Sequence, residues 1–423
     1  MSPFLTVALI LGLTAALAYI NEGYVRLQQT IGLMVLALGL TVVVGVADAI
    51  GIFGDLTGFR AFVKELSLDS TLLNGVLCFM LFAGSINVKA RTLGQEKWVI
   101  LTLAIGGTLI GAVLVALGVW SLFALFGIGI GLIYAIVFGA LISPTDPIAA
   151  LAILGNVGLP PRLEAVINGE SLFNDGVGVV VFSIALTIAL GTANPTAGDA
   201  LVMFLREVLG GVALGAAAAA IMNHTLRRTQ EDYGTQVLLS LSIVALTYAA
   251  AEHVEVSGPI ATVVLGLVTG NLTMPHLERR ERVPLKTFWR AIDESLNAVL
   301  FVLIGLHIAV VPLDTPGLPT AVVALAAIAV CLCARWLSVY GPLQALLAVG
   351  ALKADTCGLA NLLTWGGLRG GLAIAMALSL PDSSEKDTIV LMTYGVVAFS
   401  IIVQGLTVAR LFSADQLASM INR

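Results

Sequence analysis

Asp146, Glu170 and Asp175 lie within apolar runs of the stretch from residue 143 to residue 182. An ionised carboxylate is costly in an apolar environment unless it meets a cation, and otherwise it takes up a proton. Two carboxylates at one site raise each other's proton affinity, and a bound cation removes that effect. These residue types therefore favour competitive binding of protons and small hard cations.

Asp146 lies in the sequence SPTDP, from Ser143 to Pro147. Because proline has no amide proton and cannot continue a helix, the carbonyl groups around Thr145 lose their helical partners. Thr145 and Asp146 together offer carbonyl, hydroxyl and carboxylate oxygens, which are ligands for hard cations. The alternative is a proline-kinked helix whose second half is capped by Asp146. The two interpretations are compatible.

The polar residues around Asp175 fall on two neighbouring faces of a predicted helix. Ser171 and Asp175 are four residues apart and share one face. Glu170 and Asn174 share the adjacent face. We expect the first face to join the SPTDP motif in one oxygen-lined cation site. The second face leaves Glu170 in need of a cationic partner.

Two arginines, Arg335 and Arg369, also lie within apolar runs. Because a guanidinium keeps its proton, each arginine must meet a carboxylate or carbonyl groups. We expect an ion pair between Glu170 and Arg335 with a structural role. Arg369 is expected to meet carbonyl groups or to offset the charge of the cation site. Pairing of Glu170 with Arg369, and a purely structural role for both arginines, remain alternatives.

The composition identifies the setting of these residues. Of the 423 residues, 58% are hydrophobic and 11% are charged, and the mean hydropathy is +1.01. Soluble domains carry about 25% charged residues, so this composition excludes a water-soluble enzyme. A net charge of −5 argues against a nucleic-acid partner, which requires a basic face.

The apolar runs predict an all-α polytopic membrane protein, because a spanning helix needs about 20 apolar residues. We expect about thirteen transmembrane helices, at residues 3–20, 30–48, 70–88, 98–126, 130–154, 163–191, 199–223, 236–252, 257–272, 289–311, 319–346, 358–380 and 388–411.

Two predicted spans are interrupted, the fifth by SPTDP and the twelfth by GGLRGG from Gly366 to Gly371. Because they are an odd number of spans apart, corresponding helices run in opposite directions, as in inverted-repeat transporters. Broken helices at matching positions predict a substrate site near the midplane, where helices 5 and 12 cross. The alternative is that Gly and Pro are simply frequent in membrane helices.

The distribution of basic residues predicts the orientation. With the N-terminus outside, most of the 21 Lys and Arg residues fall in cytoplasmic segments, as the positive-inside rule requires. We therefore expect a multi-pass protein of the cell (inner) membrane with a cytoplasmic C-terminus. The basic run at residues 278–290 is expected to form a cytoplasmic turn or an interfacial helix.

Three stretches resemble the NhaP-type branch of the monovalent cation:proton antiporters, which includes animal sodium/proton exchangers. They are SPTDPIAALAILGNVGLPPRLEAVINGESLFNDGVGVVVF from Ser143, GPIATVVLGLVTGN from Gly258 and WGGLRGGLAIAMALSLP from Trp365. The resemblance implies electroneutral exchange of one Na⁺ or Li⁺ for one proton by alternating access, without enzymatic activity or a cofactor. Its implied partners are monovalent cations, protons and the lipid bilayer.

The resemblance also implies a division of the chain. Residues 1–97 would hold scaffold and dimerisation spans, and residues 193–311 a linker span with further scaffold. Residues 98–192 and 312–423 would form the two core repeats, which move like an elevator against the scaffold of a homodimer.

Residue roles follow from the matching motifs. The resemblance implies that Asp175 is the carboxylate that carries the ion or the proton. The further cation ligands would be Thr145, Asp146 and Ser171. Asn174 would orient the site, with Glu170, Arg335 and Arg369 in structural roles. An Asn rather than a second Asp at position 174 is typical of the electroneutral type.

One position departs from this family. Many relatives carry an acidic residue in the third span, where this chain has Ala83. Water, Ser85 or Asn87 would then take the place of that carboxylate.

The same residues are compatible with other functions. A K⁺/H⁺ antiporter is the main alternative, followed by a cation-coupled solute symporter, although donors and aromatic residues are sparse at the broken helices. An intramembrane aspartyl protease also needs two buried aspartates, but its Tyr-Asp and Gly-x-Gly-Asp contexts are missing here.

Overall fold

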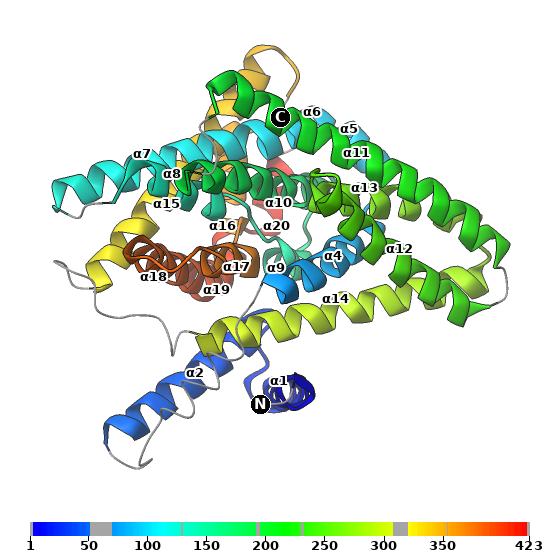
Figure 1. Ribbon diagram of the computed structural model, residues 1–423, viewed down its shortest axis with the longest axis horizontal. Coiled ribbons are helices and arrows are strands. Elements are labelled where there is room, and N and C mark those ends of the chain that lie inside the picture. The colour runs from blue at the N-terminus through cyan, green and yellow to red at the C-terminus, as the bar shows by residue number, and fades with distance from the viewer. Residues whose placement is uncertain are drawn as a thin grey trace.

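The computed structural model describes residues 3–50, 70–127, 130–191, 195–229, 232–307, 320–352 and 354–420. Within these segments the chain is helical apart from short connections (Figure 1), so the predicted all-α class is confirmed. The predicted domain boundaries at 192/193 and 311/312 lie outside the described residues.

The first half of the described chain contains the helices up to and including the sixth predicted span. They are α1 (Pro3–Ile20), η1 (Asn21–Val25), α2 (Gln29–Ala49), α4 (Ser70–Ile86), α5 (Ala90–Gln95), α6 (Lys97–Leu101), η2 (Thr102–Gly107), α7 (Thr108–Leu125), α8 (Leu132–Ile142), α9 (Ile148–Val157) and α10 (Pro161–Ala189).

The second half continues with a further series of helices. They are α11 (Ala197–Arg228), α12 (Tyr233–His253), α13 (Gly258–Val268), η3 (Thr269–Thr273), η4 (Met274–His276), α14 (Arg279–His307), α15 (Thr320–Ala348), α16 (Thr356–Gly366), α17 (Gly371–Leu378), α18 (Ser384–Phe399), η6 (Ser400–Gln404), α19 (Gly405–Leu411) and α20 (Ala414–Ser419).

In the described segments, nine helices are long and apolar enough to cross a membrane. The remaining predicted spans coincide with the short helix α4, the broken pairs α8/α9 and α16/α17, and α14. In the described residues, each predicted span therefore falls on helix, apart from the two breaks and a few residues at span ends. The number thirteen itself stays a prediction.

The basic run at residues 278–290 is not a separate turn. It forms the first part of α14, which continues without interruption from Arg279 to His307. The buried indole of Trp289 anchors this part, because it donates a hydrogen bond of 3.2 Å to Ser240 on α12 and packs against Phe82 on α4. The charged residues therefore begin a helix whose later turns are apolar.

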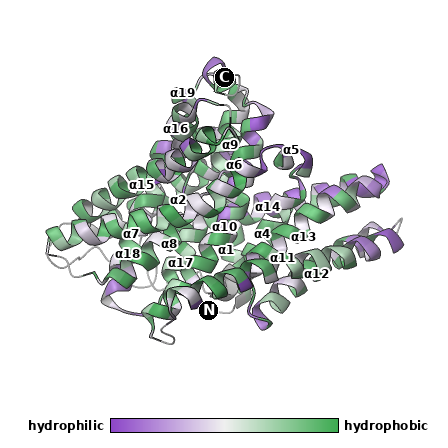
Figure 2. Ribbon diagram, turned by 90° about the horizontal axis from the view of Figure 1, so that it is seen from above, coloured by the Kyte–Doolittle hydropathy of each residue, from purple (hydrophilic) through white to green (hydrophobic). Residues whose placement is uncertain are grey.

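The outer helices expose large apolar side chains, as a bilayer requires. In the most apolar part of α11, only 11% of the residues are buried. In the last predicted span, which covers α18, η6 and α19, the corresponding share is 67%. Polar residues gather mainly at helix ends and connections (Figure 2). The two breaks lie in the interior, where Ser143, Thr145, Leu368 and Arg369 are buried. In the view of Figure 1, α10 and α17 lie near the centre, whereas Figure 2 shows α9 and α16 toward the end that holds the C-terminus.

Candidate cation site at the crossing of two broken helices

The two interrupted spans meet at their breaks. Helix α8 ends at Ile142 and α9 begins at Ile148, while α16 ends at Gly366 and α17 begins at Gly371. Between them, the amide of Asp146 donates a hydrogen bond of 2.7 Å to the carbonyl of Leu368, in an antiparallel bridge. The two extended segments thus satisfy one of each other's backbone hydrogen-bonding groups. Such pairing makes a non-helical backbone tolerable at membrane depth.

The Asp146 side chain caps the second half of its own span. Its Oδ1 accepts a hydrogen bond of 3.0 Å from the amide of Ile148, the first residue of α9. Its Oδ2 lies against Gly370, where an added Cβ would approach to 2.6 Å. The capping role is therefore present in the structure, and the same carboxylate also lines the cavity described below.

Arg369 satisfies the carbonyl groups that the prolines leave without helical partners. Its Nη1 donates to the carbonyl of Ser143 and, at 2.8 Å, to that of Pro144. Its backbone amide donates to Ser400 Oγ at 2.9 Å. Arg369 meets carbonyl groups, as expected, and its positive charge lies directly beside the break.

Glu170 and Arg335 form the ion pair expected from the sequence. Arg335 Nη1 and Nη2 donate to the two carboxylate oxygens at 2.8 Å and 2.9 Å. The side chains are 2% and 4% exposed, so the pair is shielded from water. Arg335 also donates to the carbonyl of Leu363 at 3.3 Å and thereby joins α10, α15 and α16.

Asn174 connects this ion pair to the broken fifth span. Its amide nitrogen donates to Glu170 Oε1 at 3.0 Å and to Thr145 Oγ1 at 2.8 Å. Its amide oxygen accepts from the backbone of Thr145 at 3.3 Å. Ser171 Oγ donates to the Thr145 carbonyl at 2.5 Å. The predicted polar faces of α10 therefore hold residue 145 in place from two sides.

A glycine on α10 allows this close approach. A Cβ on Gly178 would collide with the ring of Pro144, so no larger residue fits there without displacing the motif. A Cβ on Gly176 would likewise come within 2.5 Å of the Ile260 side chain on α13. Gly178 therefore allows the broken span to lie close to α10, which carries Asp175, and Gly176 allows α13 to do so.

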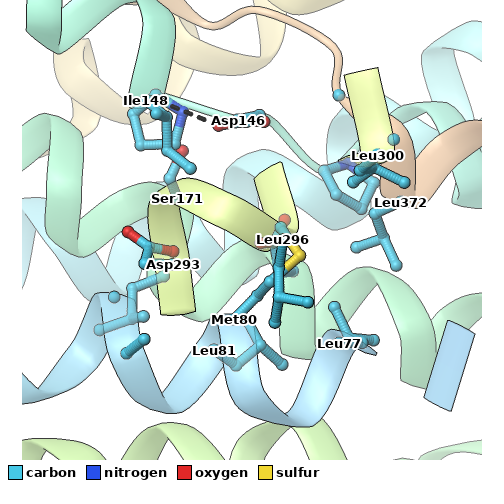
Figure 3. A pocket seen from close by; sticks show the side chains of 18 of the residues that line it. Leu77, Met80, Leu81, Asp146, Ile148, Ser171, Asp293, Leu296, Leu300 and Leu372 are labelled. Carbon is cyan, nitrogen blue, oxygen red and sulfur yellow. Dashed lines mark hydrogen bonds between the residues drawn. The ribbon is translucent and has the colours of Figure 1, made fainter. Parts of the chain in front are cut away.

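Asp146 and Asp175 line one cavity of about 290 Å³. Thr145 and Ser171 line it too, so the structure brings together all four predicted cation ligands. Figure 3 shows Asp146 and Ser171 at this cavity. Asn174, Glu170, Arg335 and Arg369 lie behind this lining, fully or nearly buried. The arrangement provides carboxylate, hydroxyl and carbonyl oxygens on one side of a cavity, with buried positive charge behind them.

Sequence reasoning missed one acidic residue of the cavity, Asp293 on α14. Its signal was a polar pair at i and i+4 with Asn297, where the charged segment gives way to the apolar run of the tenth predicted span. Asp293 did not stand out in the sequence, because the neighbouring basic residues indicate a solvated segment. Ala83, which replaces the acidic residue of many relatives, lines the cavity together with Asn87. The Ser85 hydroxyl instead donates to the Phe82 carbonyl within the helix.

Comparisons with known proteins identify the family of this chain. The chain matches the family described as "Sodium/hydrogen exchanger, transmembrane" over residues 12–414. It is 39% identical over 408 residues to the Na(+)/H(+) antiporter NhaP of Pseudomonas aeruginosa, covering 96% of this chain and 95% of that protein. It is 33% identical over 379 residues to the Na(+)/H(+) antiporter NhaH of Halobacillus dabanensis, covering 88% and 87%.

A solved structure shares the fold. The sodium proton antiporter MjNhaP1 from Methanocaldococcus jannaschii, determined at pH 8, superposes with a TM-score of 0.76 at 17% identity and 100% coverage of both chains. The resemblance to the NhaP-type antiporters is thereby confirmed, and with it the class of broken-helix transporter. The chain belongs to the transmembrane sodium/hydrogen exchanger family, a family of multi-pass membrane transporters.

Proposed function

We propose that this protein exchanges one Na⁺ or Li⁺ for one proton across the cell membrane, at the site formed by Asp146 and Asp175. The observation that carries the proposal is the cavity at the helix crossing, which these two carboxylates share with Thr145 and Ser171. The names of its relatives as Na(+)/H(+) antiporters support the same cation.

The balance of buried charge supports one-for-one exchange. Glu170 and Arg335 neutralise each other in their ion pair. Arg369 adds one positive charge, and two ionised carboxylates at Asp146 and Asp175 add two negative charges. Among these groups, which all lie in the two proposed core repeats, one negative charge is in excess, and one proton or one monovalent cation removes it. An empty, charged site is costly to move through a bilayer, so only the filled site crosses.

Competition at Asp175 links the two substrates. Without a cation, the neighbouring carboxylate of Asp146 favours protonation of Asp175. A bound Na⁺ replaces that proton and takes oxygens of Thr145 and Ser171 as further ligands. Raising the proton concentration on one side therefore fills the site with protons there, and high Na⁺ displaces them.

The structure supports an inward-facing arrangement. The cavity reaches Asn87 and Val88, beyond the end of α4 that is cytoplasmic in the predicted orientation. The proposal includes that orientation, an inner-membrane location, a homodimer, and movement of the core repeats at 98–192 and 312–423 against the rest of the chain.

The test is a pH-gradient assay in proteoliposomes that contain the purified protein. Addition of Na⁺ or Li⁺ should dissipate an imposed pH gradient, whereas choline should not. Dissipation by K⁺ with no response to Na⁺ or Li⁺ would favour the K⁺/H⁺ alternative. Absence of a response to all three cations would overturn the proposal.

A further inference from the structure

The cavity contains a third carboxylate that the proposed mechanism does not use. Asp146 and Asp175 come from the broken fifth span and from α10, but Asp293 comes from α14. Figure 3 shows its side chain among the residues that line the same cavity as Ser171. The acidic groups of the cavity therefore come from two sets of helices, the broken fifth span with α10 and, separately, α14. Helix α14 packs mainly against α2 and α4.

The surroundings of Asp293 hold it in position and leave its charge uncompensated. The side-chain amide of Asn297, itself 2% exposed, donates to the carbonyl of Asp293 at 2.9 Å and to its Oδ1 at 3.0 Å. Within the described ranges, no lysine or arginine forms a salt bridge with it. Arg290, one turn earlier, is exposed.

The other lining residues of α4 and α14 are almost entirely apolar. They include Leu77, Met80, Ala83, Leu296 and Leu300. A cation that moves along this wall of the cavity meets Asp293 as the ionisable group of these two helices. A fixed negative charge in a cavity with low-dielectric walls raises the local concentration of cations.

We propose that Asp293 attracts and transiently binds the monovalent cation on the α14 side of the cavity and so sets the apparent affinity from the cytoplasmic face. This inference rests on the proposed function and deepens it. Because α14 belongs to the proposed scaffold, Asp293 stays in place when the core repeats move. Its effect is therefore confined to the arrangement in which the site faces α14, and the two faces of the transporter differ in apparent affinity.

The experiment compares Asp293→Asn with the matched variant Glu294→Gln, which removes a charge from the neighbouring exposed residue outside the cavity lining. The amide introduced by Asp293→Asn keeps an oxygen that can accept from Asn297. In inside-out vesicles, Asp293→Asn should raise the KM for Na⁺ roughly three- to tenfold, the size expected for one partly solvated charge. The maximal rate should stay within about twofold, and Glu294→Gln should resemble the unmodified protein.

Two further measurements separate attraction from a structural effect. Asp293→Glu should restore most of the low KM, and raising ionic strength with choline chloride should shrink the difference between Asp293→Asn and the unmodified protein, because salt screens the charge. In right-side-out vesicles, the KM for Na⁺ at the outer face should be unchanged by Asp293→Asn.

Specific results would overturn the inference. Equal KM values for Asp293→Asn and Glu294→Gln, an equal rise at both faces, or a lower maximal rate at constant KM would each do so. If the unmodified protein exchanges no cation, the proposed function fails. If it exchanges Na⁺ normally and Asp293→Asn leaves the KM unchanged, only the role of Asp293 fails.

Discussion

The amide of Asp146 donates a hydrogen bond of 2.7 Å to the carbonyl of Leu368, more than two hundred residues further along the chain. This bond joins the two breaks and places the Asp146 carboxylate at the crossing. Arg369, the next residue, binds the carbonyl groups of Ser143 and Pro144. Each broken span therefore supplies hydrogen-bond partners that the other lacks, and the candidate cation site lies where they meet.

Asp175→Asn should abolish exchange. The amide side chain has nearly the same shape but can neither release a proton nor neutralise a cation, so the competition at the site is lost. The measurement is Na⁺-driven dissipation of a pH gradient in proteoliposomes, with Glu294→Gln as an active control. A Na⁺ response that persists in Asp175→Asn would refute the assignment.

Exchange should be independent of membrane potential. One proton or one monovalent cation neutralises the same excess charge, so the filled site crosses without net charge. The initial rate of exchange should therefore be equal with the potential clamped at zero, inside negative or inside positive, using valinomycin and K⁺ gradients. A rate that depends on the sign of the potential would contradict one-for-one exchange.

Glu170→Gln should destabilise the protein strongly. It leaves the buried guanidinium of Arg335 without its carboxylate, and breaking a buried pair costs about 3 to 5 kcal/mol. The expected result is a lower Tm in detergent. The double variant Glu170→Gln/Arg335→Gln should lose less stability than the two single variants combined, because neither partner is then left charged. Simple additivity would show that the pair does not brace the site.

Gly178→Ala should lower stability, whereas Gly155→Ala should not. A Cβ at Gly178 would strike the ring of Pro144, and overpacking of this kind costs about 1 to 3 kcal/mol. Gly155 on α9 has open space around the position of a Cβ, so alanine there is tolerated in the helix. Thermal unfolding of both variants in the same detergent provides the comparison. Equal Tm values would argue that the approach of α10 to the SPTDP motif is loose.

The sequence alone determined which helices break and identified most of the charged residues that lie at the crossing of the two breaks. Proline and glycine act on the local backbone, and an ionisable residue in an apolar run is costly unless it finds a partner, so both signals can be recognised from the local sequence. For this reason Asp146, Glu170 and Asp175 could be identified as site residues, together with the faces of α10 that carry Ser171 and Asn174.

Only the tertiary structure decided which residues from distant segments meet. Glu170 and Arg335 are 165 positions apart, and nothing in the local sequence separates Arg335 from Arg369 as the partner. The same holds for Asp293, whose place in the cavity depends on how α14 packs beside α4. Local sequence determines the breaks and the buried charges, but long-range packing of helices determines which charges share one cavity.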